Sequence, residues 1–186
     1  MGDSKSADID REAVLMAAKL MAAAARTAPK SRGLDSIKTL ILSEREQLEN
    51  LAKAMEERYK EDPDNLSFFK RNAEDVRNSM AVLLLGVTGE PVNLNCGACG
   101  YRYCSDFLKA AEVETEDAKG PLCIFKAIDL GIALGSAVKT AAIHNIDNRV
   151  MFSIGSAARR LKLLPADFII GIALTATGKN VYFTGR

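Results

Sequence analysis

The chain has few of the residues on which many functions depend. It contains no tryptophan, and aromatic residues make up only 6% of its 186 residues, so little material exists for a surface that stacks nucleic-acid bases. The formal net charge is +1, which argues against a general nucleic-acid binder and against attraction to acidic membranes. We therefore expect neither a nucleic-acid partner nor a membrane partner.

Signals for export and for familiar catalytic sites are also missing. No apolar run approaches the roughly 20 residues that span a bilayer, and residues 1–12 lack the basic flank and apolar core of a signal peptide. A cytoplasmic protein is the expectation. The single histidine, His144, has no serine or carboxylate motif beside it, which favours a structural role. Because no general base or nucleophile can be named, the catalytic residues stay unknown and enzymatic activity stays open.

Cysteine is the informative residue. Cys96, Cys99 and Cys104 lie close together and Cys123 follows in a C-x2-C-x4-C-x18-C pattern. Crowded thiolates repel one another unless a positive centre neutralises them. Gly97 and Gly100 let the backbone curl so that sulfurs and amide N–H groups point inward, where the N–H groups help to set a reduction potential. The pattern predicts a 4Fe–4S cluster bound by all four cysteines.

Other interpretations of the four cysteines remain open. Zinc also accepts four thiolates, but its sites usually pair two C-x2-C knuckles and this chain has one. Disulfides are possible for an even number of cysteines, although nothing indicates secretion. Unligated core thiols would account for Cys123 alone. A structural zinc-binding module is therefore kept as an alternative function.

Hydrophobic patterns predict an α+β protein with a central sheet flanked by helices. Buried strands are expected at 36–42, 80–87 and 168–175, with a short last strand at 181–184. Residues 1–9 suggest a frayed leader, and helices are expected at 10–25, 43–60, 65–79, 105–111, 124–142 and 149–161. We expect a single domain over residues 1–186, with residues 93–124 as a cluster-binding insertion.

Several local features add predictions. Ser43 and Glu46 have capping-box spacing, and Asn148 is expected to cap the last helix. The basic turn at residues 26–33 suits a solvated surface loop or a phosphate contact, and the acidic stretch at 112–117 a solvated loop or a docking edge for a basic redox partner. Gly131 and Gly135 would let another helix approach the 124–142 helix closely, either within the fold or across a subunit interface.

The cysteine motif resembles two groups of proteins. Cys-Gly-Ala-Cys-Gly-Tyr-Arg-Tyr-Cys at 96–104 is similar to the head of the 4Fe–4S modules in corrinoid iron–sulfur proteins. From Ala18 onward the chain also resembles a family of uncharacterised proteins containing a ferredoxin domain. That match is carried by the segments at 24–30, 95–101, 120–123 and 148–150 (Ala-Ala-Arg-Thr-Ala-Pro-Lys, Asn-Cys-Gly-Ala-Cys-Gly-Tyr, Gly-Pro-Leu-Cys and Asn-Arg-Val). The resemblance implies an iron–sulfur cluster without a defined reaction.

A fainter resemblance is to flavin-dependent nitroreductases. In those proteins a helix ends in an Ala-Pro turn before a strand, as at Ala28 and Pro29, and a spine helix rich in small residues follows later in the chain. The resemblance implies a three-layer arrangement around a mostly antiparallel sheet, and a homodimer with FMN at its interface. The Arg-rich flavin-phosphate segment of nitroreductases has no match before Ala18. We expect an iron–sulfur protein that transfers electrons to or from a redox partner protein, with an FMN-dependent nitroreductase-like oxidoreductase as an alternative.

Overall fold

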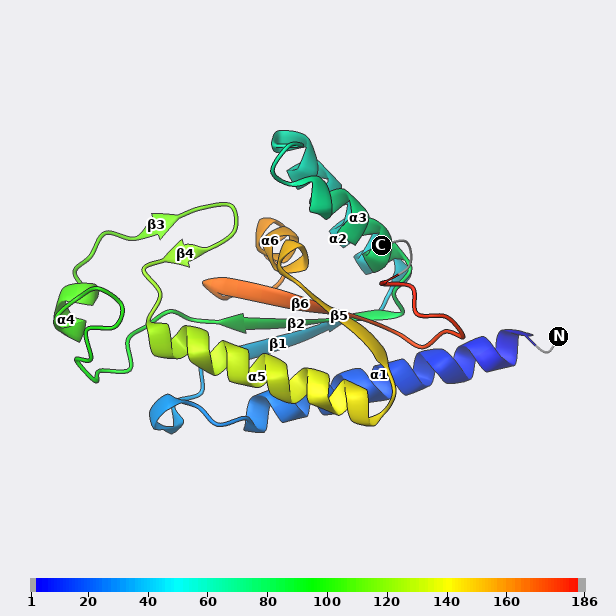
Figure 1. Ribbon diagram of the computed structural model, residues 1–186, viewed down its shortest axis with the longest axis horizontal. Coiled ribbons are helices and arrows are strands. Elements are labelled where there is room, and N and C mark those ends of the chain that lie inside the picture. The colour runs from blue at the N-terminus through cyan, green and yellow to red at the C-terminus, as the bar shows by residue number, and fades with distance from the viewer. Residues whose placement is uncertain (1–2, 184–186) are drawn as a thin grey trace.

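The computed structural model describes residues 3–183, which form a four-stranded antiparallel sheet with helices on both faces (Figure 1). The strand order is β1-β2-β6-β5, and each neighbouring pair runs antiparallel. The elements in chain order are α1 (Asp3–Thr27), η1 (Ser31–Gly33), β1 (Ile37–Leu42), α2 (Arg45–Glu61), α3 (Ser67–Arg77), β2 (Ala81–Val87), α4 (Cys104–Phe107), β3 (Val113–Glu114), β4 (Lys119–Gly120), α5 (Ile124–Ile143), β5 (Asp147–Met151), α6 (Phe152–Arg160) and β6 (Phe168–Thr175).

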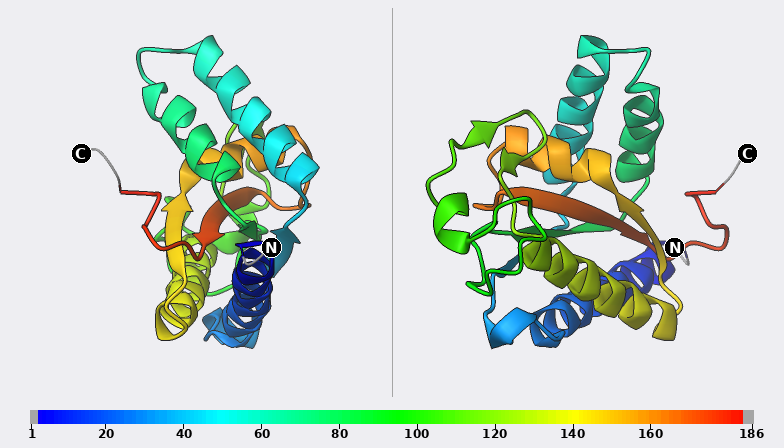
Figure 2. Two further views of the ribbon diagram at one scale, coloured as in Figure 1. Left: turned by 90° about the vertical axis from the view of Figure 1, so that its right-hand side faces the viewer. Right: turned by 60° about the vertical axis from the view of Figure 1, so that its left-hand side comes forward.

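The sheet is the middle of three layers. Helices α1 and α5 pack on one face, and α2, α3 and α6 pack on the other (Figures 1 and 2). Strand β2 is buried along all seven residues. Its side chains alternate between the layers, so Val82 and Leu84 join one core while Leu83 and Leu85 join the other. The predicted α+β class, its antiparallel central sheet and its three layers are confirmed.

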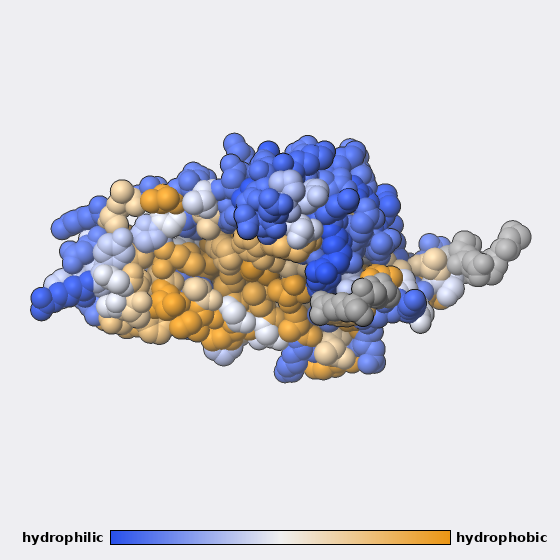
Figure 3. Space-filling model, turned by 45° about the horizontal axis from the view of Figure 1, so that its top comes forward, coloured by the Kyte–Doolittle hydropathy of each residue, from blue (hydrophilic) through white to orange (hydrophobic). Residues whose placement is uncertain are grey.

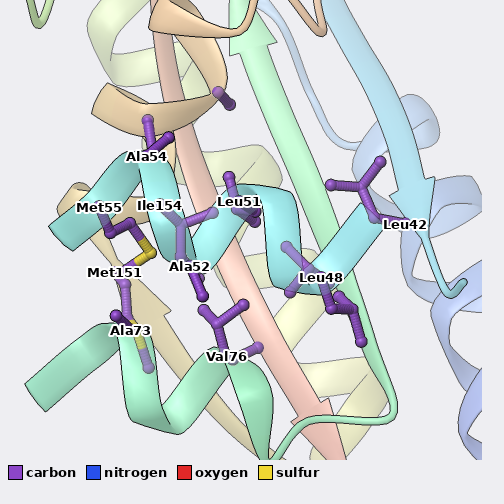
Figure 4. Packing of buried hydrophobic residues seen from close by; sticks show 14 of the residues in the cluster. Leu42, Leu48, Leu51, Ala52, Ala54, Met55, Ala73, Val76, Met151 and Ile154 are labelled. Carbon is purple, nitrogen blue, oxygen red and sulfur yellow. The ribbon is translucent and has the colours of Figure 1, made fainter. Parts of the chain in front are cut away.

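The core beneath α2, α3 and α6 depends on close packing. Figure 4 shows side chains of these helices, among them Leu51, Val76 and Ile154, converging over the sheet. Helix α6 lies so near β6 that a Cβ added at Gly155 would stand 1.7 Å from the carbonyl oxygen of Ile169. Only glycine permits this approach of helix to strand.

The opposite core uses small side chains. Ala18 and Ala25 of α1 and Ala133, Ala137 and Ala141 of α5 are buried where these helices cover the sheet. Alanine adds little bulk to a helix, so both helices can lie close to each other and to the strands. Within residues 3–183, no helix has the length and hydropathy needed to cross a membrane.

Four local predictions are corrected by the structure. Helix α1 already begins at Asp3, so the predicted frayed leader is wrong from that residue onward. Asn148 lies within β5 and does not cap a helix, because α6 begins only at Phe152. In the α2 cap Gln47 replaces Glu46, accepting hydrogen bonds from the N–H groups of Ser43 and Glu44 at 3.1 Å. Residues 181–183 form bends in place of the predicted last strand, and residue 184 lies outside the described residues.

Candidate metal centre

The cysteine segment, residues 93–124, lies off the end of the main sheet where α5 begins (Figures 1 and 2). It contains α4 and the β3–β4 hairpin, and the Lys119 N–H of the hairpin donates a hydrogen bond at 2.9 Å to the carbonyl of Asp167, the residue directly before β6. Val87 at the end of β2 leads into this region and accepts a hydrogen bond from the Asp167 N–H at 2.9 Å. Backbone hydrogen bonds therefore attach the segment to the end of the sheet.

The backbone before α4 curls tightly, as the glycines predicted. Gly97 and Gly100 have φ values of 72° and 89°, and Asn93 and Asn95 also have positive φ at 57° and 50°. Glycine adopts these conformations without strain and asparagine tolerates them better than most residues. The Gly100 N–H bonds the Gly97 carbonyl at 3.0 Å, so one of the predicted inward-facing donors is used within the turn.

The four cysteines differ in exposure. Cys96 is exposed, Cys99 and Cys104 are half-buried, and Cys123 is 4% exposed. Cys123 packs with Val92 and Phe107 in a small buried group that we call the loop core. Cys99 packs against the loop core together with Tyr101 and Phe125. The fold therefore brings Cys99 and Cys123 into one group although they lie far apart in the sequence.

Cys104 is held by a neighbour that sequence reasoning missed. The Asn95 N–H donates to the Cys104 sulfur at 3.4 Å, and the Cys104 N–H donates to Asn95 Oδ1 at 2.8 Å. This reciprocal pair fixes the start of α4 and aims one backbone donor at a sulfur, which is the kind of contact that stabilises a ligating thiolate. An asparagine directly before Cys96 was the available signal, since asparagine favours positive φ and local hydrogen bonds.

Cys123 occupies the N-cap position of α5, the 20-residue helix that follows it. Its N–H donates to the Gly89 carbonyl at 2.9 Å, and its carbonyl accepts from the N–H groups of Lys126 and Ala127. A helix N-terminus carries a partial positive charge and unpaired N–H groups, both of which favour an anion. The position suits a thiolate that ligates a metal.

The donor set fits a four-thiolate cluster in kind and number, but the side chains are not gathered into a closed site. Within residues 3–183, no group of three or more His, Cys, Asp or Glu residues has the arrangement of a metal site. All four cysteines are free thiols, so the structure forms none of the disulfides considered above. Cys99 packs against the loop core that contains Cys123, Cys104 lies one helical turn from Phe107 of the loop core, and Cys96 is exposed.

The two charged stretches have definite partners. In the basic turn, Lys30 donates to the Ala25, Arg26 and Ala28 carbonyls at the end of α1, while Arg26 pairs with Asp35. Three of the four acids in residues 112–117 form ion pairs, as the side chains of Glu112, Glu114 and Asp117 reach Lys119, Arg159 and Arg58 respectively. His144 lies exposed at the C-cap of α5. Most of these charged side chains therefore make contacts within the protein.

Comparison with known proteins now gives the family. A family model described as "Uncharacterized protein containing a ferredoxin domain (DUF2148)" matches residues 119–184. An "Uncharacterized protein" of Archaeoglobus fulgidus is 46% identical over 177 residues, which cover 95% of this chain and 94% of that protein. The chain belongs to this ferredoxin-domain family. The residues matched by the family model include Cys123 and begin after the other three cysteines.

Solved structures similar to this ferredoxin-domain protein show its fold. Nitroreductase A from Vibrio parahaemolyticus matches with a TM-score of 0.55 at 15% identity, covering 92% of this chain and 61% of that one. A BluB-like flavoprotein from Clostridium difficile matches with a TM-score of 0.60 at 12% identity, covering 92% and 84%. The NADPH:FMN oxidoreductase of Vibrio harveyi gives a TM-score of 0.52 at 14% identity, covering 92% and 63%. The predicted nitroreductase-like fold is confirmed, and the chain spans about three fifths of the first of these relatives.

Proposed function

We propose that this ferredoxin-domain protein binds one 4Fe–4S cluster through Cys96, Cys99, Cys104 and Cys123 and exchanges single electrons with a redox partner protein. The observation that carries the proposal is the packing of Cys99 against the loop core that contains Cys123. This packing supports the proposal because a cysteine of the glycine-rich turn and the distant fourth cysteine belong to the same packed region. Family membership supports iron–sulfur chemistry, because the family model describes a ferredoxin domain.

The chain's own residues would provide the setting of the cluster. Cys123 at the N-terminus of α5 and the Asn95 N–H near the Cys104 sulfur both place positive polarity beside anionic sulfur. When bound, a 4Fe–4S cluster takes up or releases one electron at a time. Exposure of Cys96 at the surface keeps one side of the site open to a partner. We further propose that residues 93–124 act as the cluster-binding insertion of a single domain.

The test is metal analysis of protein purified without oxygen. The proposal expects about four iron and about four sulfide per chain, together with visible absorption that bleaches on reduction. Cys99→Ser and Cys123→Ser should each lose that absorption, whereas Ser105→Ala, a change at an exposed position of α4, should keep it. One zinc per chain without sulfide would overturn the proposal in favour of the structural zinc module.

A second candidate is an FMN-dependent oxidoreductase in which the cluster exchanges electrons with a flavin. It is favoured by the fold, which is shared with proteins described as an NADPH:FMN oxidoreductase and a flavoprotein. The cavity beside the cysteine segment, lined in part by Gly89, Phe107 and Pro121, measures about 110 Å³. Cofactor pockets usually measure roughly 300–1,000 Å³, so a flavin site here would need surface from a second copy. Release of FMN on heating supports this candidate, and failure to take up FMN under reducing conditions contradicts it.

We also propose that the protein is a homodimer. Figure 3 shows apolar residues gathered on one face of the molecule. On α5, Ile124, Ile128 and Ile132 recur at helical spacing and are 37%, 46% and 39% exposed, and apolar residues that lie together on a surface can mark a protein–protein contact. Gly131 and Gly135 of this helix face open space, which would allow a second helix to approach. Ile128→Asp should shift the sedimentation coefficient from dimer to monomer, whereas Lys53→Asp at an exposed position of α2, on the other face of the sheet, should not.

A further inference from the structure

Two charged side chains are buried in the first turns of α5, directly after Cys123. Lys126 is 4% exposed and Asp129 is 1% exposed. Buried charges are rare and unfavourable unless they are paired and hydrogen-bonded. The distance between Lys126 Nζ and Asp129 Oδ2 is 3.8 Å, and Asp129 Oδ2 is buried without a hydrogen-bond partner. The two charges are therefore buried but only weakly paired with each other. Their remaining hydrogen bonds go to another part of the chain.

Both side chains fasten the loop that follows α1. Asp129 Oδ1 accepts hydrogen bonds from the Ser31 N–H and from the Ser31 hydroxyl, each at 2.8 Å. Lys126 Nζ donates to the Leu34 carbonyl at 3.0 Å. Residues 31–34 are therefore tied at both ends to the helix that carries Cys123. Figures 1 and 2 show this loop beside the beginning of α5.

The same loop also holds the chain that leads to the other three cysteines. Arg32 adopts a φ of 55°, a left-handed conformation that is unfavourable for a residue with a Cβ. Its guanidinium donates to the Val92 carbonyl at 2.9 Å. Val92 is 1% exposed and packs with Cys123 and Phe107 in the loop core. Strained backbone of this kind persists where surrounding contacts fix it, and it gathers at functional positions.

Residues 31–34 thus join two parts of the site that are distant in the sequence. One side of the loop contacts the helix after Cys123, and the other contacts Val92, the residue directly before the cysteine segment. The ionic pair lies within the first two turns of α5, so its charges also act on any group bound at Cys123. Because a buried pair seldom adds stability over apolar packing, stability alone does not explain its presence beside the site.

We propose that residues 31–34 form a clasp that sets the position of Cys123 relative to the residue 95–104 loop, and that Lys126 and Asp129 tune the reduction potential of the group bound there. Ser31, Arg32, Lys126 and Asp129 are positioning residues in this view. The tuning part rests on the proposed cluster. The clasp part concerns this chain alone and can be tested without any cluster.

The first experiment measures alkylation of Cys123 by iodoacetamide in reduced, cluster-free protein, with peptide mass spectrometry to resolve each cysteine. Arg32→Asn keeps a residue that tolerates positive φ but cannot reach Val92, and Ser31→Ala removes one donor to Asp129. Each should raise the Cys123 rate about fivefold, which corresponds to modest local opening. Exposed Cys96 serves as the internal control, and Arg32→Lys should restore slow alkylation. Unchanged Cys123 rates in both variants overturn the clasp.

The second experiment measures the reduction potential of the loaded protein by spectroelectrochemical titration. Asp129→Asn removes a negative charge and should raise the potential, whereas Lys126→Met removes a positive charge and should lower it. The double variant, which removes both charges and avoids a lone buried ion, should return toward the wild-type value. Glu57→Gln on α2, beyond the sheet, is the control and should change nothing. Shifts in one shared direction, or none, overturn the tuning. Wild-type protein that takes up no cluster instead refutes the proposed function, and the alkylation result still decides the clasp.

Discussion

The main sheet and the cysteine segment are stabilised by different means. Strand β2 is buried along its whole length between two hydrophobic cores. The cysteine segment has one small buried group, in which its Phe107 and Cys123 pack with Val92 directly before it, and single hydrogen bonds such as the pair between Asn95 and Cys104. Local stability follows the amount of buried apolar contact. We therefore expect the cysteine segment to open more easily than the sheet and its two cores, because fewer apolar side chains are buried in it.

The largest expected effect is on the scaffold. Gly155→Ala would place a Cβ 1.7 Å from the Ile169 carbonyl oxygen, a backbone atom of β6 that cannot move alone. We expect the free energy of unfolding to fall by about 3 kcal/mol or more, measured by urea denaturation. Gly178→Ala, where an added Cβ meets nothing within 4 Å, is the matched control. Equal stability of the two variants would contradict the close packing of α6 on β6.

A pair of phenylalanines sharpens the contrast between the regions. Phe69 is fully buried in the core beneath α2, α3 and α6, and Phe107 is 6% exposed in the loop core. Phe69→Ala should lower the free energy of global unfolding by about 3–5 kcal/mol. Phe107→Ala should lower it by less than about 1 kcal/mol, because the segment can open locally before the sheet unfolds.

The same pair should reverse its order when cluster content is measured. Phe107→Ala removes one of the three side chains of the loop core, which contains Cys123 and against which Cys99 packs, so reconstituted protein should retain less iron than wild type. Phe69→Ala, studied at a temperature where it stays folded, should retain iron normally. Similar losses of global stability in the two variants would show that the cysteine segment is part of the main cooperative unit.

The same division explains what could be predicted from the sequence. Strand β2 could be predicted because it is covered on both faces, which requires a continuous run of apolar residues. Helix α5 could be predicted from the long apolar pattern after Cys123. Strand β5 was missed because Asp147, Asn148 and Arg149 give a polar edge strand no hydrophobic signature. At the site, spacing indicated which cysteines to consider. It could not indicate that Arg32 and Asp129, distant in the sequence, hold the segment, since such contacts arise only from the tertiary fold.

The smallest expected effect concerns the charges that join α2 to α3. A hydrogen bond from Arg77 lowers the pKa of Glu56 below its ordinary value of 4.5, and the Arg77 guanidinium lies 2.7 Å from Glu56 Oε1. A lowered folded-state pKa contributes stability above the unfolded pKa, and that contribution disappears as the pH falls through the folded value. Glu56→Gln should therefore cost up to about 1 kcal/mol at pH 7, as expected for a partly exposed pair. The difference from wild type should shrink below about pH 4.5.

Urea denaturation at a series of pH values measures this difference in the free energy of unfolding. Glu57→Gln, whose carboxylate lies 3.9 Å from Arg160, is the control. A pH-independent difference would mean that Glu56 stabilises the helices through packing and not through its charge. Ion pairs would then contribute little to the stability of the scaffold, and its difference from the cysteine segment would rest on apolar packing alone.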